Sequence, residues 1–165
     1  MTPSQRDAFC GGKPTIYQKI AGILAPVILL GILVYIGVIY HTLPDRIPTH
    51  YTFSGEIDGW GSKALLWVTP IIGVVTDLSL WIVGFFPQSW NTGTTVTPWN
   101  RARVFRLTRD LMADLRLGMA AIWAAVTLFT VHAADGFPGW VLMAVILAAS
   151  VLPLLRYFLR LSRKR

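Results

Sequence analysis

Charged residues are scarce in this sequence. Only 14% of the 165 residues are Asp, Glu, Lys or Arg, whereas 54% are hydrophobic. The mean hydropathy is +0.55. Soluble domains carry about 25% charged residues, because their surfaces must be solvated. The composition therefore excludes an ordinary soluble domain and predicts a membrane protein.

Cysteine, acidic residues and catalytic motifs are also rare. Cys10 is the only cysteine, which excludes an intramolecular disulfide and predicts a reduced, idle thiol. Asp and Glu together number only 8. The sequence contains no HExxH spacing and no serine in an elbow motif. We therefore predict no catalytic residue, no cofactor and no enzyme activity.

Long apolar runs are what the sequence does contain. Four of them are long enough to cross a membrane, at residues 20–40, 64–86, 117–134 and 138–159. At about 1.5 Å per residue, the first extends roughly 31 Å and matches a hydrocarbon core of about 30 Å. Spans must be helical here, because lipid cannot pair with open backbone groups. We predict one all-α, polytopic membrane domain over residues 1–165, with four transmembrane helices.

The positions of the cations predict the orientation. Most of the 15 Lys and Arg residues lie in the N-terminal tail, between the second and third spans, and at the C-terminal end. These cations are Arg6, Lys13, Lys19, Arg101, Arg103, Arg106, Arg109, Arg156, Arg160, Arg163, Lys164 and Arg165. The positive-inside rule then places both termini in the cytoplasm and predicts a multi-pass protein of the cytoplasmic membrane.

The net charge of +7 also bears on partners. Topology determinants and contacts with anionic headgroups of the lipid bilayer account for it, at roughly 1 kcal/mol per residue near the surface. No nucleic-acid-binding module fits beside four spans, so we do not expect nucleic acid as a partner.

The segment before the third span has a helical period. Within residues 98–116 one side is apolar from Val104 onward, and the opposite side carries most of the charges. We predict an amphipathic helix that lies in the cytoplasmic interface before the chain turns into the third span. An alternative is that this helix is a docking surface for a protein partner inside the cell.

Asp77 lies near the middle of the second span. A charge there costs about 2.5–3.5 kcal/mol on insertion scales, so the carboxyl group should face the bundle interior. Arg116 is a partner by charge. Helical side chains, however, lean toward the N-terminus of their own helix, which would move the Arg116 and Asp77 side chains apart. We keep two hypotheses: a proton or ion site, and a neutral carboxyl group that is hydrogen-bonded within the bundle.

The polar loop at residues 41–63 joins the first two spans and faces outward in the predicted orientation. Residues 49–53 alternate and are β-prone, and Asp58-Gly59 is a turn dipeptide. We predict a β-hairpin or a compact loop across the bundle mouth. With Asp77, its polar side chains are the candidate functional residues: Asp45, His50, Glu56, Asp58, Trp60 and Lys63. A metal held by His50, Glu56 and Asp58 is the weaker hypothesis, and internal hydrogen bonds are the favoured one.

The loop sequence LPDRIPTHYTFSGEIDGWGSK resembles the signature of the domain-of-unknown-function family 1648, which occurs in SdpI-like bacterial membrane proteins. The matching residues are Leu43, Pro44, Ile47, Pro48 and His50, then Gly55, Glu56, Asp58, Gly59, Gly61, Ser62 and Lys63. Thr52 departs from the family pattern, in which an Asn is expected. The resemblance covers about residues 20–86 and implies a bacterial cytoplasmic-membrane location. Some relatives give a cell immunity to its own secreted peptide toxin and signal to a cytoplasmic repressor.

Three functional hypotheses follow. The first is a non-enzymatic protein for sensing, immunity or regulation, with a peptide ligand at the outer loop and a protein partner inside. The second is a small transporter or channel subunit built around Asp77. The third is a membrane enzyme with a metal in the outer loop.

Overall fold

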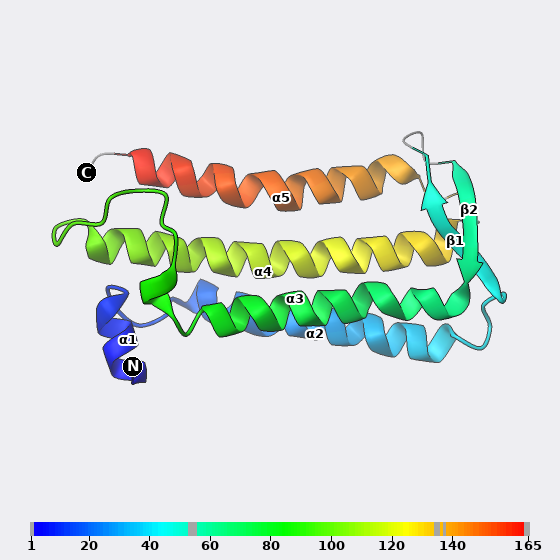
Figure 1. Ribbon diagram of the computed structural model, residues 1–165, viewed down its shortest axis with the longest axis horizontal. Helices are drawn as coiled ribbons and strands as arrows, with labels where there is room; N and C mark the ends of the chain where they lie inside the picture. Colours follow the sequence, from blue (N-terminus) through cyan, green and yellow to red (C-terminus); the bar gives the residue numbers. More distant parts are fainter. Residues whose placement is uncertain (1, 53–55, 134–135, 137, 164–165) are drawn as a thin grey trace.

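The structure is a computed structural model that describes residues 2–52, 56–133, 136 and 138–163. Gly55 of the loop motif, Ala134 at the end of the predicted third span, and the cations Lys164 and Arg165 lie outside these residues. Four long helices run side by side, and a β-hairpin covers one end of the bundle (Figure 1). Both termini lie at the opposite end. We name these ends the hairpin end and the terminal end.

The elements follow one another along the chain in a simple order. They are α1 (Pro3–Phe9), α2 (Ile16–Ile39), β1 (Arg46–Tyr51), β2 (Ile57–Ser62), the 3-10 helix η1 (Lys63–Trp67), α3 (Val68–Val83), the 3-10 helix η2 (Pro87–Ser89), α4 (Arg101–His132) and α5 (Gly139–Ser162). Four helical segments are long and apolar enough to cross a membrane: Ile16–Ile39, Lys63–Val83, Arg101–His132 and Gly139–Ser162. The chain is therefore a mostly helical, multi-pass membrane protein, as predicted.

The first span begins earlier than the predicted residue 20. Thr15 caps it, because its hydroxyl accepts from the backbone of Gln18 while the Gln18 side chain accepts from the backbone of Thr15. Such a reciprocal cap satisfies two amide groups that a helix start otherwise leaves unpaired. Helix α2 therefore extends past the apolar run toward the terminal end.

The predicted turn between an interfacial helix and the third span does not exist. Residues 101–132 form one continuous helix, α4, of 32 residues. At about 1.5 Å per residue it is roughly 48 Å long, which exceeds the hydrocarbon core of about 30 Å. Its start also differs from residue 98, because Thr97 and Asn100 bond reciprocally in a turn that precedes Arg101.

The core is built from two small clusters on α2. Near the hairpin end, Ile32 and Ile36 pack with Ile47 of β1 and Leu66 of η1. Ile47 is 3% exposed, so it fixes the hairpin to the bundle. Burying an aliphatic side chain of this size from water contributes about 1.5–3 kcal/mol. The second cluster lies deeper in the bundle, around Ala25, Leu29 and Ala120.

Candidate functional site

The loop motif forms an antiparallel hairpin, in agreement with one of the two predicted forms. Its glycines let the strands approach closely. A Cβ atom at Gly59 would lie 2.8 Å from the Cβ of His50, and one at Gly61 would lie 2.8 Å from Cγ2 of Thr49. Real Cβ atoms do not come so near, so a larger residue would push β2 away from β1. These two glycines therefore have a structural reason to be in the motif.

The charged candidate residues of the hairpin pair with one another. Nδ1 of His50 lies 2.5 Å from Oδ1 of Asp58, across the two strands. Nζ of Lys63 lies 3.1 Å from Oδ1 of Asp45 and donates to the carbonyl of Leu43 at 3.2 Å. All of these residues belong to the motif. These contacts show that the motif residues stabilise the hairpin and the segments that connect it to α2 and η1.

Glu56 and Trp60 have exposed side chains, as do the paired candidates His50, Asp58 and Asp45. The Glu56 side chain is exposed, while its backbone pairs with Thr52 in both directions. The Thr52 hydroxyl is one of these partners, so the residue that departs from the family pattern still supplies an acceptor. Trp60 is 49% exposed, and its carbonyl accepts from Arg46. These two side chains are available to an incoming molecule.

The hairpin residues do not form a metal site in the described part of the chain. No three His, Cys, Asp or Glu side chains gather there. His50 and Asp58 form a pair, and Asp45 is engaged with Lys63.

A cavity of about 350 Å³ lies between the hairpin and the bundle, and we name it the hairpin pocket. Its lining is mainly apolar and comes from β1, η1, α3, α4 and α5. The lining includes Ile47, Tyr51, Leu65, Val68, Phe129 and Leu142. The ring of Tyr51 packs edge-on against Phe129 with centroids 4.8 Å apart. Burial raises the pKa of the Tyr51 phenol, so this wall of the pocket stays uncharged at neutral pH.

Asp77 is not near the hairpin candidates. It lies in the middle of α3, is 6% exposed, and accepts hydrogen bonds from two nitrogens of one guanidinium group. Nε of Arg116 lies 2.7 Å from Oδ1, and Nη2 lies 2.8 Å from Oδ2. The hypothesis of a neutral carboxyl group that is hydrogen-bonded within the bundle is therefore replaced by a bidentate ion pair.

The expected separation of Asp77 and Arg116 was wrong for a geometric reason. The hydroxyl groups of Thr69 and Thr127 lie 2.9 Å apart, which sets α3 against α4 so that Asp77 is level with Met119. Arg116 is three residues from that level, or about 4.5 Å along the axis. The tilt of a helical side chain toward the N-terminus of its helix fixes only the direction of its Cα–Cβ bond. The long Arg stem beyond it turns back and spans the offset.

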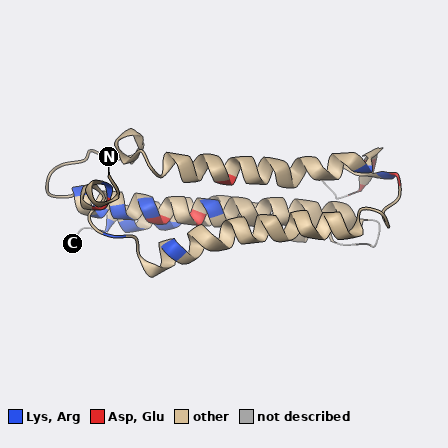
Figure 2. Ribbon diagram, turned by 90° about the horizontal axis from the view of Figure 1, so that it is seen from below, with Lys and Arg blue, Asp and Glu red and all other residues tan. Residues whose placement is uncertain are grey.

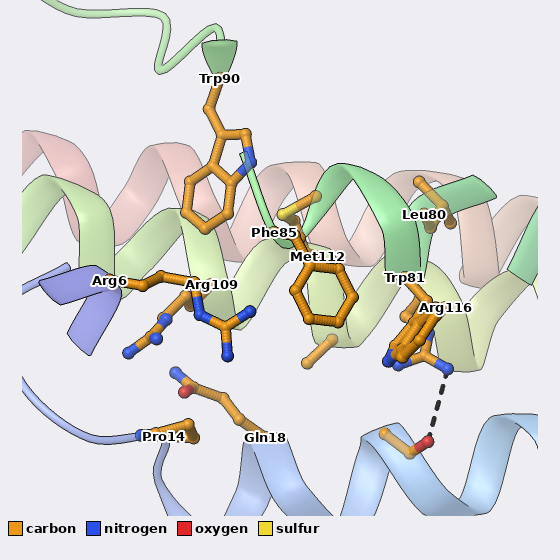
Figure 3. Close-up of a pocket in the computed structure, with 13 residues that line it drawn as sticks. Arg6, Pro14, Gln18, Leu80, Trp81, Phe85, Trp90, Arg109, Met112 and Arg116 are labelled. Carbon is orange, nitrogen blue, oxygen red and sulfur yellow. Dashed lines mark hydrogen bonds between the residues drawn. The ribbon is translucent and has the colours of Figure 1, made fainter. Parts of the chain in front are cut away.

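Arg116 has a second acceptor that the sequence analysis missed. Its Nη2 donates to the carbonyl of Gly22 at 3.4 Å, the dashed contact in Figure 3. Pro26 lies inside α2 and has no N–H, so the carbonyl four residues earlier loses its helical partner. That carbonyl is Gly22. The sequence signal that could have revealed this acceptor was Pro26, four residues after Gly22, because a proline there leaves the Gly22 carbonyl open to an arginine of another helix.

The charged side of α4 lies against other parts of the chain rather than open headgroups, which corrects the predicted interfacial position. Asp110 accepts from Gln18 and Arg160, at 2.7 and 3.1 Å. Asp114 accepts from Arg156 at 2.7 Å and also from the Tyr17 hydroxyl. Figure 2 shows the Lys and Arg residues concentrated toward the terminal end. This network joins α4 to α2 and α5.

Helix α1 adds to the same network. Arg109 lies 2.8 Å from Oδ1 of Asp7 and donates to the carbonyl of Gly12 at 2.6 Å, and Arg106 donates to the carbonyl of Gly11 at 2.7 Å. The cations that would form a docking surface for a partner are thus engaged within the chain.

Cys10 gives a test of how tightly α1 is seated. The thiol is 1% exposed, and burial raises its pKa, while the nearby Arg109 lowers it. Only the thiolate is alkylated. We expect a soluble maleimide to modify native Cys10 at least about tenfold more slowly than the unfolded chain near pH 7. The rate should rise as the pH approaches the raised pKa.

The matched control for this test carries Cys10→Ser and Ser4→Cys, which moves the thiol from the C-cap of α1 to an exposed position within α1. Mass spectrometry gives both rates. Equal rates for native Cys10 and the control would contradict the seated position of α1. The raised pKa also predicts that the contribution of Cys10 to stability is fully present below the unfolded thiol pKa of about 8.5 and is lost progressively as the pH rises from there through the raised pKa of the folded state.

Comparison with known families bears on the hairpin. Residues 27–74 match the family model of the domain of unknown function DUF1648. This segment, less than a third of the chain, is similar to that domain. The match starts in α2, contains the whole hairpin and ends in α3, so the resemblance stated from the loop is confirmed over a shorter range than residues 20–86. Asp77 lies beyond its end. No curated protein and no solved structure matches the chain.

Proposed function

We propose that the protein is a non-enzymatic receptor of the bacterial cytoplasmic membrane, and that it binds an apolar segment of a secreted peptide at its hairpin end. The hairpin pocket is the observation that carries this proposal. Its volume of about 350 Å³ falls in the range of ligand sites, roughly 300–1,000 Å³. The excess of Lys and Arg at the terminal end supports an orientation with the hairpin outside.

The form of the pocket favours a peptide with an apolar face. An amphipathic helix inserts one or two large side chains into an apolar groove and leaves its polar face in water. At the hairpin, the pocket would hold the apolar side chains of the peptide. Trp60 and the His50–Asp58 pair would contact its polar face. Capture of a membrane-active peptide here agrees with immunity or sensing, the functions that the family resemblance implies.

Peptide binding by the full-length protein in lipid nanodiscs tests this proposal. The probes are a panel of fluorescein-labelled amphipathic helical peptides, each paired with a scrambled peptide of the same composition. We expect at least one amphipathic peptide to bind more tightly than its scrambled partner. Leu65→Trp, which fills the pocket from η1, should weaken that binding by about tenfold, the effect of losing about 1.4 kcal/mol.

Val38→Trp is the matched control, because Val38 is exposed on α2 and does not line the pocket. It should leave the affinity unchanged. Equal loss in both variants, or no preference for any amphipathic peptide over its scrambled partner, would rule out the hairpin pocket as a peptide site.

A further inference from the structure

A second cavity lies near the terminal end, and we name it the basic cavity. It measures about 200 Å³ and is lined by three arginines, Arg6, Arg109 and Arg116, with Gln18, Trp81 and Phe85 among its other walls. No acidic side chain is among the described residues that line it. Figure 3 shows Arg6 and Arg109 on one side of Phe85 and Met112, and Arg116 on the other.

The three arginines are not equally neutralised. Arg109 has Asp7 as its partner, and Arg116 has Asp77. Arg6 makes no ion pair among the described residues. Its guanidinium group stacks 4.8 Å above the ring of Phe85, and its buried Nε has no hydrogen-bond partner there. Buried polar groups are almost always paired, so an unpaired cationic N–H marks a missing acceptor. One negative charge with acceptor oxygens would complete this site.

An apolar groove continues from the basic cavity. The two share Gly22, Trp81 and Arg116, and the groove has a volume of about 560 Å³. Its apolar walls come from α2 and α3 and include Leu30, Leu33 and Leu78. Arg116 of α4 and its ion-pair partner Asp77 also line it, so this polar part of the wall is neutral as a pair. Leu30 and Leu78 are exposed, so the groove opens on the face that lipid would cover.

The length of the groove matches one leaflet. From Gly22 to Leu33 along α2 is about 16 Å, and half of a hydrocarbon core is about 15 Å. The basic cavity lies at the end of the groove that is nearer the termini, where headgroups of that leaflet would be. A cation at headgroup depth and an apolar channel of leaflet length are together complementary to a phospholipid.

We propose that the basic cavity and the groove bind one anionic phospholipid, with its phosphate at Arg6 and Arg109 and an acyl chain between α2 and α3. Three arginines with two paired carboxylates leave one positive charge. The phosphodiester of an anionic phospholipid balances it with one net negative charge, whereas in phosphatidylcholine the choline ammonium group already cancels the phosphate. The phosphodiester oxygens would accept from the unpaired Nε of Arg6. This site is distinct from general attraction to a charged membrane surface, because it has walls and one unpaired donor. It lies at the opposite end of the bundle from the hairpin pocket and does not depend on it.

Native mass spectrometry of the full-length protein in a non-ionic detergent tests the site. The probes are phosphatidylglycerol and phosphatidylcholine with the same acyl chains, and inorganic phosphate alone. We expect one phosphatidylglycerol to bind with preference over phosphatidylcholine. Arg6→Gln should reduce that preference by about fivefold, the effect of one cation near a headgroup. Arg163→Gln, which removes an equal charge from an exposed residue at the same end, should leave the preference unchanged.

The groove has its own variant pair. Leu30→Trp fills the groove and should weaken phosphatidylglycerol binding, whereas Val34→Trp, at an exposed position on α2 that does not line the groove, should not. This pair keeps the test decisive even where Arg6→Gln fails to fold. Equal effects of Arg6→Gln and Arg163→Gln would overturn the proposal in favour of non-specific attraction. Binding of inorganic phosphate that depends on Arg6, without any effect of Leu30→Trp, would overturn it in favour of a free-anion site.

Discussion

Replacing Arg116 with Ala should lower the free energy of unfolding by about 3–5 kcal/mol, because it leaves a buried carboxylate without its partner. Asp77 is 6% exposed within the bundle, and both its oxygens accept from this one guanidinium group. Neither lipid nor the neighbouring apolar side chains can replace those hydrogen bonds. Equilibrium unfolding of the detergent-solubilised protein, followed by circular dichroism during a titration with dodecyl sulfate, gives the value.

A double variant shows whether the loss of stability comes from an unpaired charge or from the loss of the ion pair itself. With Asp77→Asn and Arg116→Gln combined, both groups are neutral and can still hydrogen-bond, so much of the loss from Arg116→Ala should be recovered. Arg163→Ala is the control, because it removes an exposed cation and should change stability by less than about 0.5 kcal/mol. A stability loss from Arg116→Ala no larger than that of the control would contradict the buried ion pair.

The same variants address transport. A transporter built around Asp77 requires the carboxylate to bind and release a proton or an ion, and Asp77→Asn would abolish that flux. The bidentate contact with Arg116 favours a structural role instead. We expect Asp77→Asn in liposomes to show no change in proton-linked flux relative to the wild type. Lost flux with intact folding would support the transporter hypothesis.

Gly118→Ala should be less stable than Gly31→Ala by about 1–3 kcal/mol, the usual cost of overpacking. A Cβ at Gly118 would lie 2.8 Å from the carbonyl oxygen of Ala149 on α5, whereas one at Gly31 would meet nothing within 4 Å. Both changes replace glycine with alanine inside a helix, so the gain in helix propensity cancels in the comparison. The difference isolates the contact between α4 and α5.

The dodecyl sulfate titration also measures this difference. Because the obstructing atom belongs to the backbone of α5, a rotation of a side chain cannot make room, and the two helices must separate. Close backbone approach of this kind contributes to packing in lipid, where the hydrophobic effect between helices is absent. If the two variants had equal stability, the contact between Gly118 and Ala149 would not exist as described.

Much of the fold was predictable because it depends on local composition. A run of apolar residues must form a helix in lipid, whatever lies beside it, so the four spans were identified from the sequence. The β-prone run and the turn dipeptide likewise indicated a β-hairpin or a compact loop, and the structure has the hairpin. Packing contacts between helices were harder to predict from the sequence. Alanines spaced by four, such as Ala120 and Ala124, permit close contact, but a close approach to the backbone of α5 occurs at Gly118. Spacing on one helix does not specify the facing helix.

The candidate residues likewise include some whose contacts could be predicted from the sequence and some whose contacts could not. The sequence alone identified the hairpin residues, and their internal pairing was the favoured hypothesis there; the contacts of His50 with Asp58 and of Lys63 with Asp45 agree with it. Arg116 was named as the partner of Asp77 by charge, but the geometry was expected to separate them. The register of α3 on α4 and the reach of an arginine side chain can be known only from the tertiary structure. The continuous α4 was missed since its charges looked solvated, when α1, α2 and α5 supply their partners.

The sequence by itself determined that this is a membrane protein with four spans, a polar loop between the first two, and a basic terminal end. Each of these depends on hydropathy, turn chemistry or charge along the chain. Only the tertiary structure decided which charges are neutralised and which space is left open. An ion pair needs two side chains from different helices at one depth, and a cavity needs several elements around it. The pairing of Arg116, the unpaired Nε of Arg6 and the two cavities all follow from how the helices meet.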